Sequence, residues 1–248
     1  MTTLPHSGHN VLDLSVFRGE GGGARDFGTV PLLDTSELRW FATGPLPLGV
    51  IAWFTCDGTI GTVEERTDVY QLHRLHDIGV KRRARDILEV KVRRSIGDDL
   101  AVTADLAAPF EEWRKWSPFE GDPMTPSADI PWIDVHKTII TRTFMLSDRE
   151  VVGPAAHADD SLSGCDVEIA AVIVGGVESW ALGFEAFGPK SDRRRVVTSS
   201  WDMLIAESGE FDDLGSCFDL AAGYPEWLAA IESTVSTDTP ASADRLTG

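Results

Sequence analysis

Basic residues are scarce in this chain. Its 248 residues include 22 Lys and Arg against 40 Asp and Glu, which gives a formal net charge of −18. A protein that binds nucleic acid needs many cationic side chains to displace counterions from the phosphates, and an anionic membrane surface attracts basic segments in the same way. The composition therefore excludes general nucleic-acid binding and a membrane-surface partner.

Cysteines and long apolar segments are also few. Cys56, Cys165 and Cys217 lie far apart and form no CxxC pair, which favours reduced thiols over a disulfide framework. No apolar run approaches the roughly 18–20 residues of a membrane helix, and the N-terminal MTTLPHSGHN lacks the basic start and apolar stretch of a secretory signal. We therefore expect a cytoplasmic protein.

Familiar catalytic motifs are missing as well. The sequence contains no GxSxG elbow and no HExxH metal motif. The glycine-rich GEGGG near the N-terminus is not followed by GK[ST], so it does not predict a P-loop.

Apolar and aromatic residues are abundant enough for a large core. The hydrophobic fraction is 42%, with eight Trp and eleven Phe, and aromatic side chains bury a large area each. The length suits one large domain. We predict a flexible N-terminal arm over residues 1–30, a single domain over residues 31–233 and a disordered tail over residues 234–248.

Alternation of polar and apolar residues is the main structural signal, and it predicts β-strands. It is clearest in LEVKVR (residues 88–93), where Glu89, Lys91 and Arg93 share one face. Further strands are expected over residues 62–72, 78–83, 132–144, 165–174 and 178–187. Helices are expected over residues 109–116 and 225–233, each with proline and acids at its start, and on a weaker pattern over residues 197–207. Many short strands with few helices indicate an antiparallel sheet or barrel with helices outside it.

Positive charge concentrates between Arg74 and Arg94. This window holds eight basic and three acidic residues, although the whole chain is acidic. Lysine and arginine side chains that converge from rigid strands form a clamp for phosphate or carboxylate groups. If the strands are neighbours, such a clamp would consist of Lys81, Arg83, Lys91 and Arg93. The alternative that the residues leave open is a solvated outer face of an antiparallel sheet.

Acidic residues are interleaved with these bases and are candidates for a metal site. Carboxylates hold Mg²⁺ while the metal shares phosphate oxygens. The candidates are Glu64, Asp68, Glu89, Glu168 and Glu185. For each of them, a salt bridge to a facing arginine is the alternative interpretation.

The order of these segments resembles a known family. EERTDVY, GVKRR, LEVKVR, VHKTIITRTF, DVEIA and GFEAFG follow one another and are similar to successive strands of the CYTH superfamily, the triphosphate tunnel metalloenzymes. The resemblance covers residues 62–190. It implies an α+β, mainly β fold, an antiparallel eight-stranded, tunnel-like barrel with a few outer helices. The family's first-strand motif, Glu-x-Glu-x-Lys, has no counterpart among these segments.

The resemblance also implies roles for individual residues. Basic side chains of the tunnel would grip a triphosphate, while glutamates would bind Mg²⁺ or Mn²⁺. Phosphate contacts would be made by Arg66, Lys81, Arg83, Lys91, Arg93, Lys137 and Arg142. Glu64, Glu168 and Glu185 would hold the metal, and Glu89 and Lys91 would act in catalysis. Lys137 and Arg142 differ in parity, so both face one tunnel only if a β-bulge lies between them.

Three functions are open from the sequence. The first is a metal-dependent phosphohydrolase that acts on a nucleoside or inorganic triphosphate. The second is a barrel that binds a small phosphorylated or other anionic ligand without turnover, which the missing Glu-x-Glu pair favours. The third is an interaction protein whose charged strip meets an acidic partner.

Overall fold

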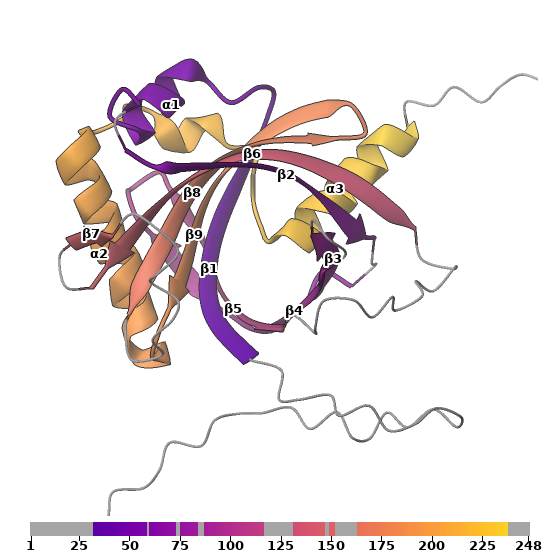
Figure 1. Cartoon of the computed structure of the whole chain (residues 1–248), viewed down its shortest axis with the longest axis horizontal. Coiled ribbons are helices and arrows are strands. Elements are labelled where there is room, and N and C mark those ends of the chain that lie inside the picture. Colours follow the sequence, from indigo (N-terminus) through magenta and orange to yellow (C-terminus); the bar gives the residue numbers. More distant parts are fainter. Residues whose placement is uncertain are drawn as a thin grey trace, which may run out of the picture.

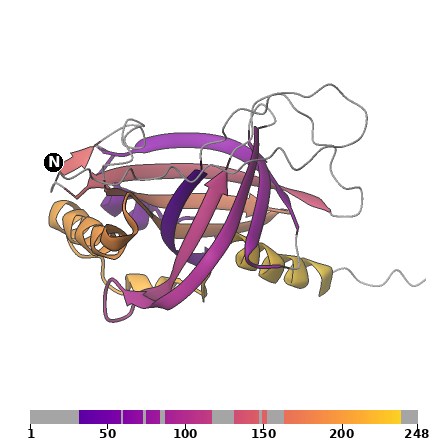
Figure 2. The same cartoon turned by 90° about the horizontal axis from the view of Figure 1, so that it is seen from below.

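Eight antiparallel strands close into a barrel in the computed structural model, which describes residues 32–58, 60–72, 75–83, 87–116, 131–146, 149–151 and 163–237. Around the barrel the strands follow the order β1 (Leu32–Thr43), β5 (Ala107–Trp116), β4 (Ile87–Ala101), β3 (Ile78–Arg83), β2 (Thr62–Gln71), β6 (Trp132–Met145), β8 (Gly164–Val174) and β9 (Val177–Phe187). Pairing of β9 with β1 closes the ring (Figures 1 and 2). The predicted fold class and barrel are confirmed.

Short elements and helices complete the fold. They are α1 (Leu48–Phe54), β7 (Arg149–Val151), α2 (Lys190–Ser208), the 3₁₀ turn η4 (Leu214–Cys217), β10 (Leu220–Ala221) and α3 (Tyr224–Thr237). In Figure 1, α1 and α2 lie together against one side of the barrel and α3 lies apart from them. No helix in the described part of the chain is long and apolar enough to cross a membrane.

The outer side of the barrel carries the larger apolar core. In β1 the even-numbered Leu38 and Trp40 point outward and pack with Phe184 of β9 and with Trp201 of α2. Because side chains of a strand alternate between its two sides, the odd-numbered residues of β1 point into the barrel. The helices α1 and α2 therefore cover apolar outer faces, and the barrel interior is left for other side chains.

A second apolar cluster fills one end of the barrel. It contains Phe41, Tyr70 and Val135 from the strands, together with Trp227 and Leu228 of α3. The rings of Phe41 and Trp227 stack with centroids 4.4 Å apart and planes inclined by 5°. The helix α3 therefore closes this end of the barrel, and the part of the interior that adjoins it is polar.

Most strand predictions are confirmed. The expected segments at 62–72, 78–83, 88–93, 132–144, 165–174 and 178–187 correspond to β2, β3, β4, β6, β8 and β9. The helix expected over 225–233 is α3, and the one expected over 197–207 is α2, which begins seven residues earlier at Lys190. Residues 1–30 lie outside the described residues, and α3 runs four residues into the predicted tail.

The helix predicted over residues 109–116 is wrong, because these residues form β5. This segment pairs with β1 on one side and with β4 on the other, and such pairing overrides a weak local preference for helix. Pro109 is compatible with the strand because the pairing of β5 with β1 ends at Glu111. At Pro109 the side of β5 that faces β1 is therefore unpaired, and the missing backbone N–H of proline costs no hydrogen bond there.

Candidate functional site

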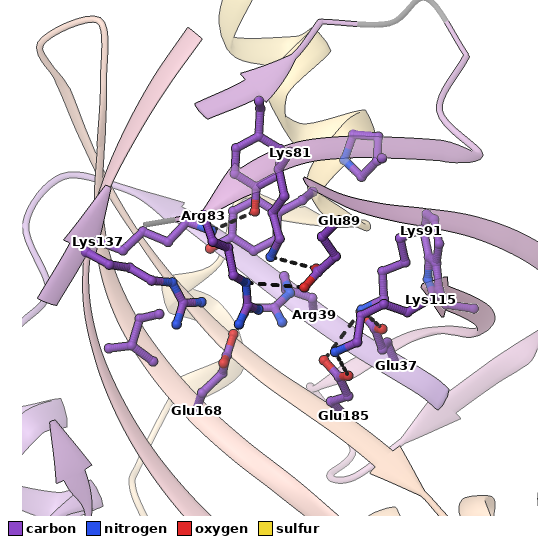
Figure 3. Close-up of a pocket in the computed structure, with 17 residues that line it drawn as sticks. Glu37, Arg39, Lys81, Arg83, Glu89, Lys91, Lys115, Lys137, Glu168 and Glu185 are labelled. Atoms are coloured by element: carbon purple, nitrogen blue, oxygen red, sulfur yellow. Dashed lines mark hydrogen bonds and ion pairs between the residues drawn. The ribbon is translucent and has the colours of Figure 1, made fainter. Parts of the chain in front are cut away.

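Charged side chains line a cavity inside the barrel (Figure 3). Its volume is about 80 Å³. The lining contains seven basic and four acidic side chains, together with Tyr70, Trp113, Ile139 and Tyr224. The basic ones are Arg39, Arg66, Lys81, Arg83, Lys91, Lys115 and Lys137, and the acidic ones are Glu37, Glu89, Glu168 and Glu185.

One wall of the cavity comes from the neighbouring strands β3 and β4. Lys81 and Glu89 are directly opposite in the register. The Lys81 Nζ lies 2.9 Å from a Glu89 carboxylate oxygen, and the Arg83 Nε lies 3.2 Å from the other. Burial opposes the ionisation of Glu89, whose side chain is 6% exposed, but Lys81 and Arg83 outweigh it and lower its pKa to about 2. The charged face of these strands points inward, so the solvated-face interpretation is wrong for them.

A second group surrounds Lys137 of β6. Its Nζ donates a hydrogen bond of 2.8 Å to the Tyr70 hydroxyl, lies 3.2 Å from an Asp68 oxygen, and lies 3.8 Å from the centroid of the Tyr224 ring. Burial and the nearby Lys81 lower the Lys137 pKa well below its usual range, against the opposing effect of Asp68. Burial would raise the Asp68 pKa, but Lys81 and Lys137 keep it low. Lys137 therefore loses its proton more readily than an exposed lysine does.

A third group links three strands across a glycine. Arg39 of β1 and Glu168 of β8 are both opposite Gly183 of β9 in the register. A Cβ atom on Gly183 would lie 2.7 Å from an Arg39 nitrogen, closer than such contacts allow. The missing side chain therefore lets the Arg39 guanidinium pass over β9 to Glu168, with the Arg39 Nη1 2.5 Å from the carboxylate.

Lys91 of β4 forms a fourth group with two acids. Its ammonium group makes an ion pair with Glu37 of β1 and lies 3.5 Å from a Glu185 oxygen of β9. Lys115 of β5 approaches Glu185 from the side, at 3.7 Å, which is too long for a hydrogen bond. Figure 3 shows these four side chains pointing toward one another.

The carboxylates of the cavity are shared among the cations. Glu89 lies within ion-pair distance of both Lys81 and Arg83, and Glu185 lies within ion-pair distance of both Lys91 and Lys115. The buried Asp68 lies within ion-pair distance of Arg66, Lys81 and Lys137. A buried cation is costly unless an anion is near, and here Asp68, Glu89 and Glu185 each lie near two or more cations.

The structure brings together most of the predicted site residues but not all of them. Those that line the cavity are Arg66, Lys81, Arg83, Glu89, Lys91, Lys137, Glu168 and Glu185. Arg93 lies beside the cavity, in ion pairs with Glu111 and Glu226 and over the Trp113 ring. Glu64 is 57% exposed on its side chain and pairs with Arg66.

Arg142 lies outside the cavity, which corrects its expected place there. Its guanidinium is buried against the helices, where it donates hydrogen bonds to the Phe54 carbonyl at 3.1 Å and the Ser208 hydroxyl at 2.9 Å and pairs with Glu207. The register of β6 with β8 runs without a shift from Lys137 to Arg142. Without a bulge, residues five apart on a strand point to opposite sides.

Several lining residues were missing from the sequence prediction. They are Glu37 and Arg39 of β1, Lys115 of β5, and Tyr224 of α3. The signal for the first two was the alternation of Glu37 and Arg39 with Leu38 and Trp40. It was missed because the flanking residues of β1 are mixed in polarity on both sides. Lys115 was missed because its segment was predicted to be a helix.

The carboxylates in this arrangement do not fit a metal ion. Across the described residues, no three His, Cys, Asp or Glu side chains are grouped so that they could hold one. Each lining carboxylate instead faces a cation: Glu37 and Glu185 face Lys91, Glu89 faces Lys81, and Glu168 faces Arg39. The Mg²⁺ or Mn²⁺ implied by the resemblance therefore does not match the positions of these side chains.

Comparison with known proteins adds no relative, since no family model and no curated protein matches the sequence.

Proposed function

We propose that the barrel binds a small anion with several negative charges, of the phosphate or polyphosphate type, in the charged cavity. One observation carries this proposal: seven basic side chains converge with four acidic ones around one partly open cavity, inside a protein whose net charge is −18. Folding this excess positive charge into the barrel costs free energy, and an anion that enters recovers it. Arginine forks and lysine ammonium groups are the donors that phosphate oxygens prefer.

The size of the cavity selects among anions. Its volume of about 80 Å³ is well below the roughly 300 Å³ at which sites for drug-sized ligands begin. Inorganic phosphate, pyrophosphate or tripolyphosphate matches this space better than a nucleotide with its base and sugar. The tunnel-like barrel and its inward bases are also what the resemblance to the triphosphate tunnel family implies, and this supports the choice of a polyphosphate.

The inward-facing residues of β1 can be compared with the first-strand motif of that family. β1 presents Thr35, Glu37 and Arg39 on its inward side, at the spacing of the family motif Glu-x-Glu-x-Lys. The central acid is kept, threonine takes the place of the first acid, and arginine takes the place of the lysine. We infer a divergent tunnel barrel in which the anion-binding side is retained and the acidic side is reduced.

Isothermal titration calorimetry with sulfate, phosphate, pyrophosphate and tripolyphosphate tests binding. We expect one site per chain and an affinity that rises with ligand charge. Because Lys81 and Arg83 form the wall of the cavity, the double variant Lys81→Met/Arg83→Met should lose at least tenfold in affinity. Lys190→Met is the matched control, since Lys190 is a 71% exposed lysine on the outer surface. Equal loss in both variants, or no binding at all, would contradict the proposal.

Hydrolysis of the bound polyphosphate is the second candidate, and Lys137 favours it. Lysine is one of the side chains that act as general acids or bases, and a lowered pKa favours this role. Burial lowers the pKa of Lys137, whose ammonium group donates a hydrogen bond to the Tyr70 hydroxyl. A phosphate-release assay with tripolyphosphate, run with Mg²⁺, with Mn²⁺ and with a chelator, distinguishes an enzyme from a binding protein. Release above the buffer rate that disappears in Lys137→Met supports hydrolysis, whereas release equal to buffer leaves a binding protein.

A further inference from the structure

Two acidic side chains face each other inside the barrel. Glu37 of β1 and Glu185 of β9 are directly opposite in the antiparallel register, and both line the cavity. Like charges opposite each other on neighbouring strands are destabilising, and burial increases the penalty. Burial and the neighbouring Glu185 raise the pKa of Glu37. A cation between the two carboxylates opposes this effect and allows both to stay charged.

The structure supplies that cation from another strand of the barrel. Lys91 belongs to β4, which is adjacent to neither β1 nor β9 in the barrel. Its side chain points into the interior past β5, and its ammonium group pairs with Glu37 and lies 3.5 Å from Glu185 (Figure 3). Burial opposes the charge on Lys91, but Glu185 and Glu37 outweigh it and raise the Lys91 pKa above its usual range. The ammonium is therefore a fixed part of the site.

We propose that the ammonium group of Lys91 takes the position of a divalent cation between Glu37 and Glu185, so that the cavity binds its anion without a metal ion. A metal bridging these carboxylates would need their oxygens at roughly 2.0–2.2 Å, in the volume that the ammonium fills. It would also have to release Lys91 into a cavity already rich in positive charge. The metal-free binding of the anion depends on the proposed function above, whereas the exclusion of the metal by Lys91 does not.

Removing Lys91 should create a metal site. In Lys91→Met the two acids keep their positions on paired strands, and Lys115 at 3.7 Å is the remaining base beside Glu185. We expect Mn²⁺ at about a hundredfold above its Kd to raise the melting temperature of this variant by roughly 5–10 °C. The same concentration should leave the wild-type melting temperature unchanged.

Two variants control for general effects. Lys81→Met also removes a buried lysine that lies near two acids, Glu89 and Asp68. Each of these acids keeps another cation, Arg83 for Glu89 and Lys137 for Asp68, so this variant should gain no response to Mn²⁺. The double variant Lys91→Met/Glu185→Gln lacks one of the two ligands and should lose the response that Lys91→Met gained. Titration of Mn²⁺ followed by electron paramagnetic resonance counts the bound ions directly.

The outcomes decide the proposal independently of the anion. It is overturned if wild-type protein binds one Mn²⁺ that Glu185→Gln abolishes, because Lys91 would then yield to the metal, or if folded Lys91→Met gains no Mn²⁺ site. Should Lys91→Met fail to fold, the wild type and Glu185→Gln still test the first outcome. Binding of the anion without a metal ion is tested separately. The Kd for inorganic phosphate measured in the presence of EDTA should agree within twofold with the Kd measured in the presence of Mg²⁺, and a strict Mg²⁺ requirement would overturn this part of the proposal.

Discussion

Replacing Glu89 with glutamine removes the carboxylate that pairs with Lys81 and Arg83 in the cavity. Its pKa falls from the ordinary value of 4.5 to about 2 in the folded protein, and each pKa unit corresponds to about 1.4 kcal/mol. The side chain is 6% exposed, so solvent screening is small. We therefore expect Glu89→Gln to lower the free energy of unfolding by about 3 kcal/mol at neutral pH, in line with the ~3–5 kcal/mol cost of breaking a buried ion pair.

The pH dependence of this loss provides a sharper test. Since the folded-state pKa of Glu89 is depressed, its stabilising contribution is complete above the unfolded pKa of 4.5 and is lost as the pH falls toward 2. The difference in unfolding free energy between wild type and Glu89→Gln should fall to roughly half its neutral-pH value at about pH 3. Urea unfolding followed by tryptophan fluorescence measures it, with the exposed Glu178→Gln as the control. A difference below about 1 kcal/mol at neutral pH, or one that does not change on acidification, would refute the reasoning.

Three further results are expected. Arg142→Met should lower the free energy of unfolding by about 2 kcal/mol through its lost hydrogen bonds, yet leave the Kd for tripolyphosphate unchanged, because Arg142 lies outside the cavity; a weakened Kd in calorimetry would contradict this. Trp227→Ala should destabilise by about 3–5 kcal/mol in urea unfolding, since it removes the ring stacked on Phe41; a loss below 1 kcal/mol would show that α3 is not an integral closure. Affinity for sulfate should rise as the pH falls, because burial lowers the Lys137 pKa and the anion favours the protonated form; calorimetry in buffers of different ionisation enthalpy should detect proton uptake in wild type and not in Lys137→Met.

Alternation was sufficient to predict the strands on which one face is uniformly charged. In β3 Lys81 and Arg83 share one parity, and in β4 the charged residues of the segment 88–93 do so too. Their common orientation could therefore be predicted before the direction they face was known. Whether that face pointed to solvent or to the interior depended on closure of the sheet, which requires β1. β1 could not be predicted because Leu33 and Phe41 share its inward side with Glu37 and Arg39, and no simple alternation results.

The contacts between distant segments could not be read from the sequence. Arg39 and Glu168 are 129 residues apart and meet because Gly183 lies between their strands, a relation that appears only once the register is known. Parity alone, in contrast, separated Lys137 from Arg142, and the regular register of β6 confirms that separation. Local pattern therefore predicts which way a side chain points relative to its neighbours, while strand order decides which side chains meet.

The most direct test of anion binding in the cavity is a crystal structure with tungstate, an analogue of phosphate whose anomalous scattering identifies its position. The proposal predicts an anomalous peak inside the barrel, within hydrogen-bond distance of Lys81 and Arg83, that tripolyphosphate displaces. Tungstate found only on the outer surface, with an empty cavity at saturating concentration, would contradict it.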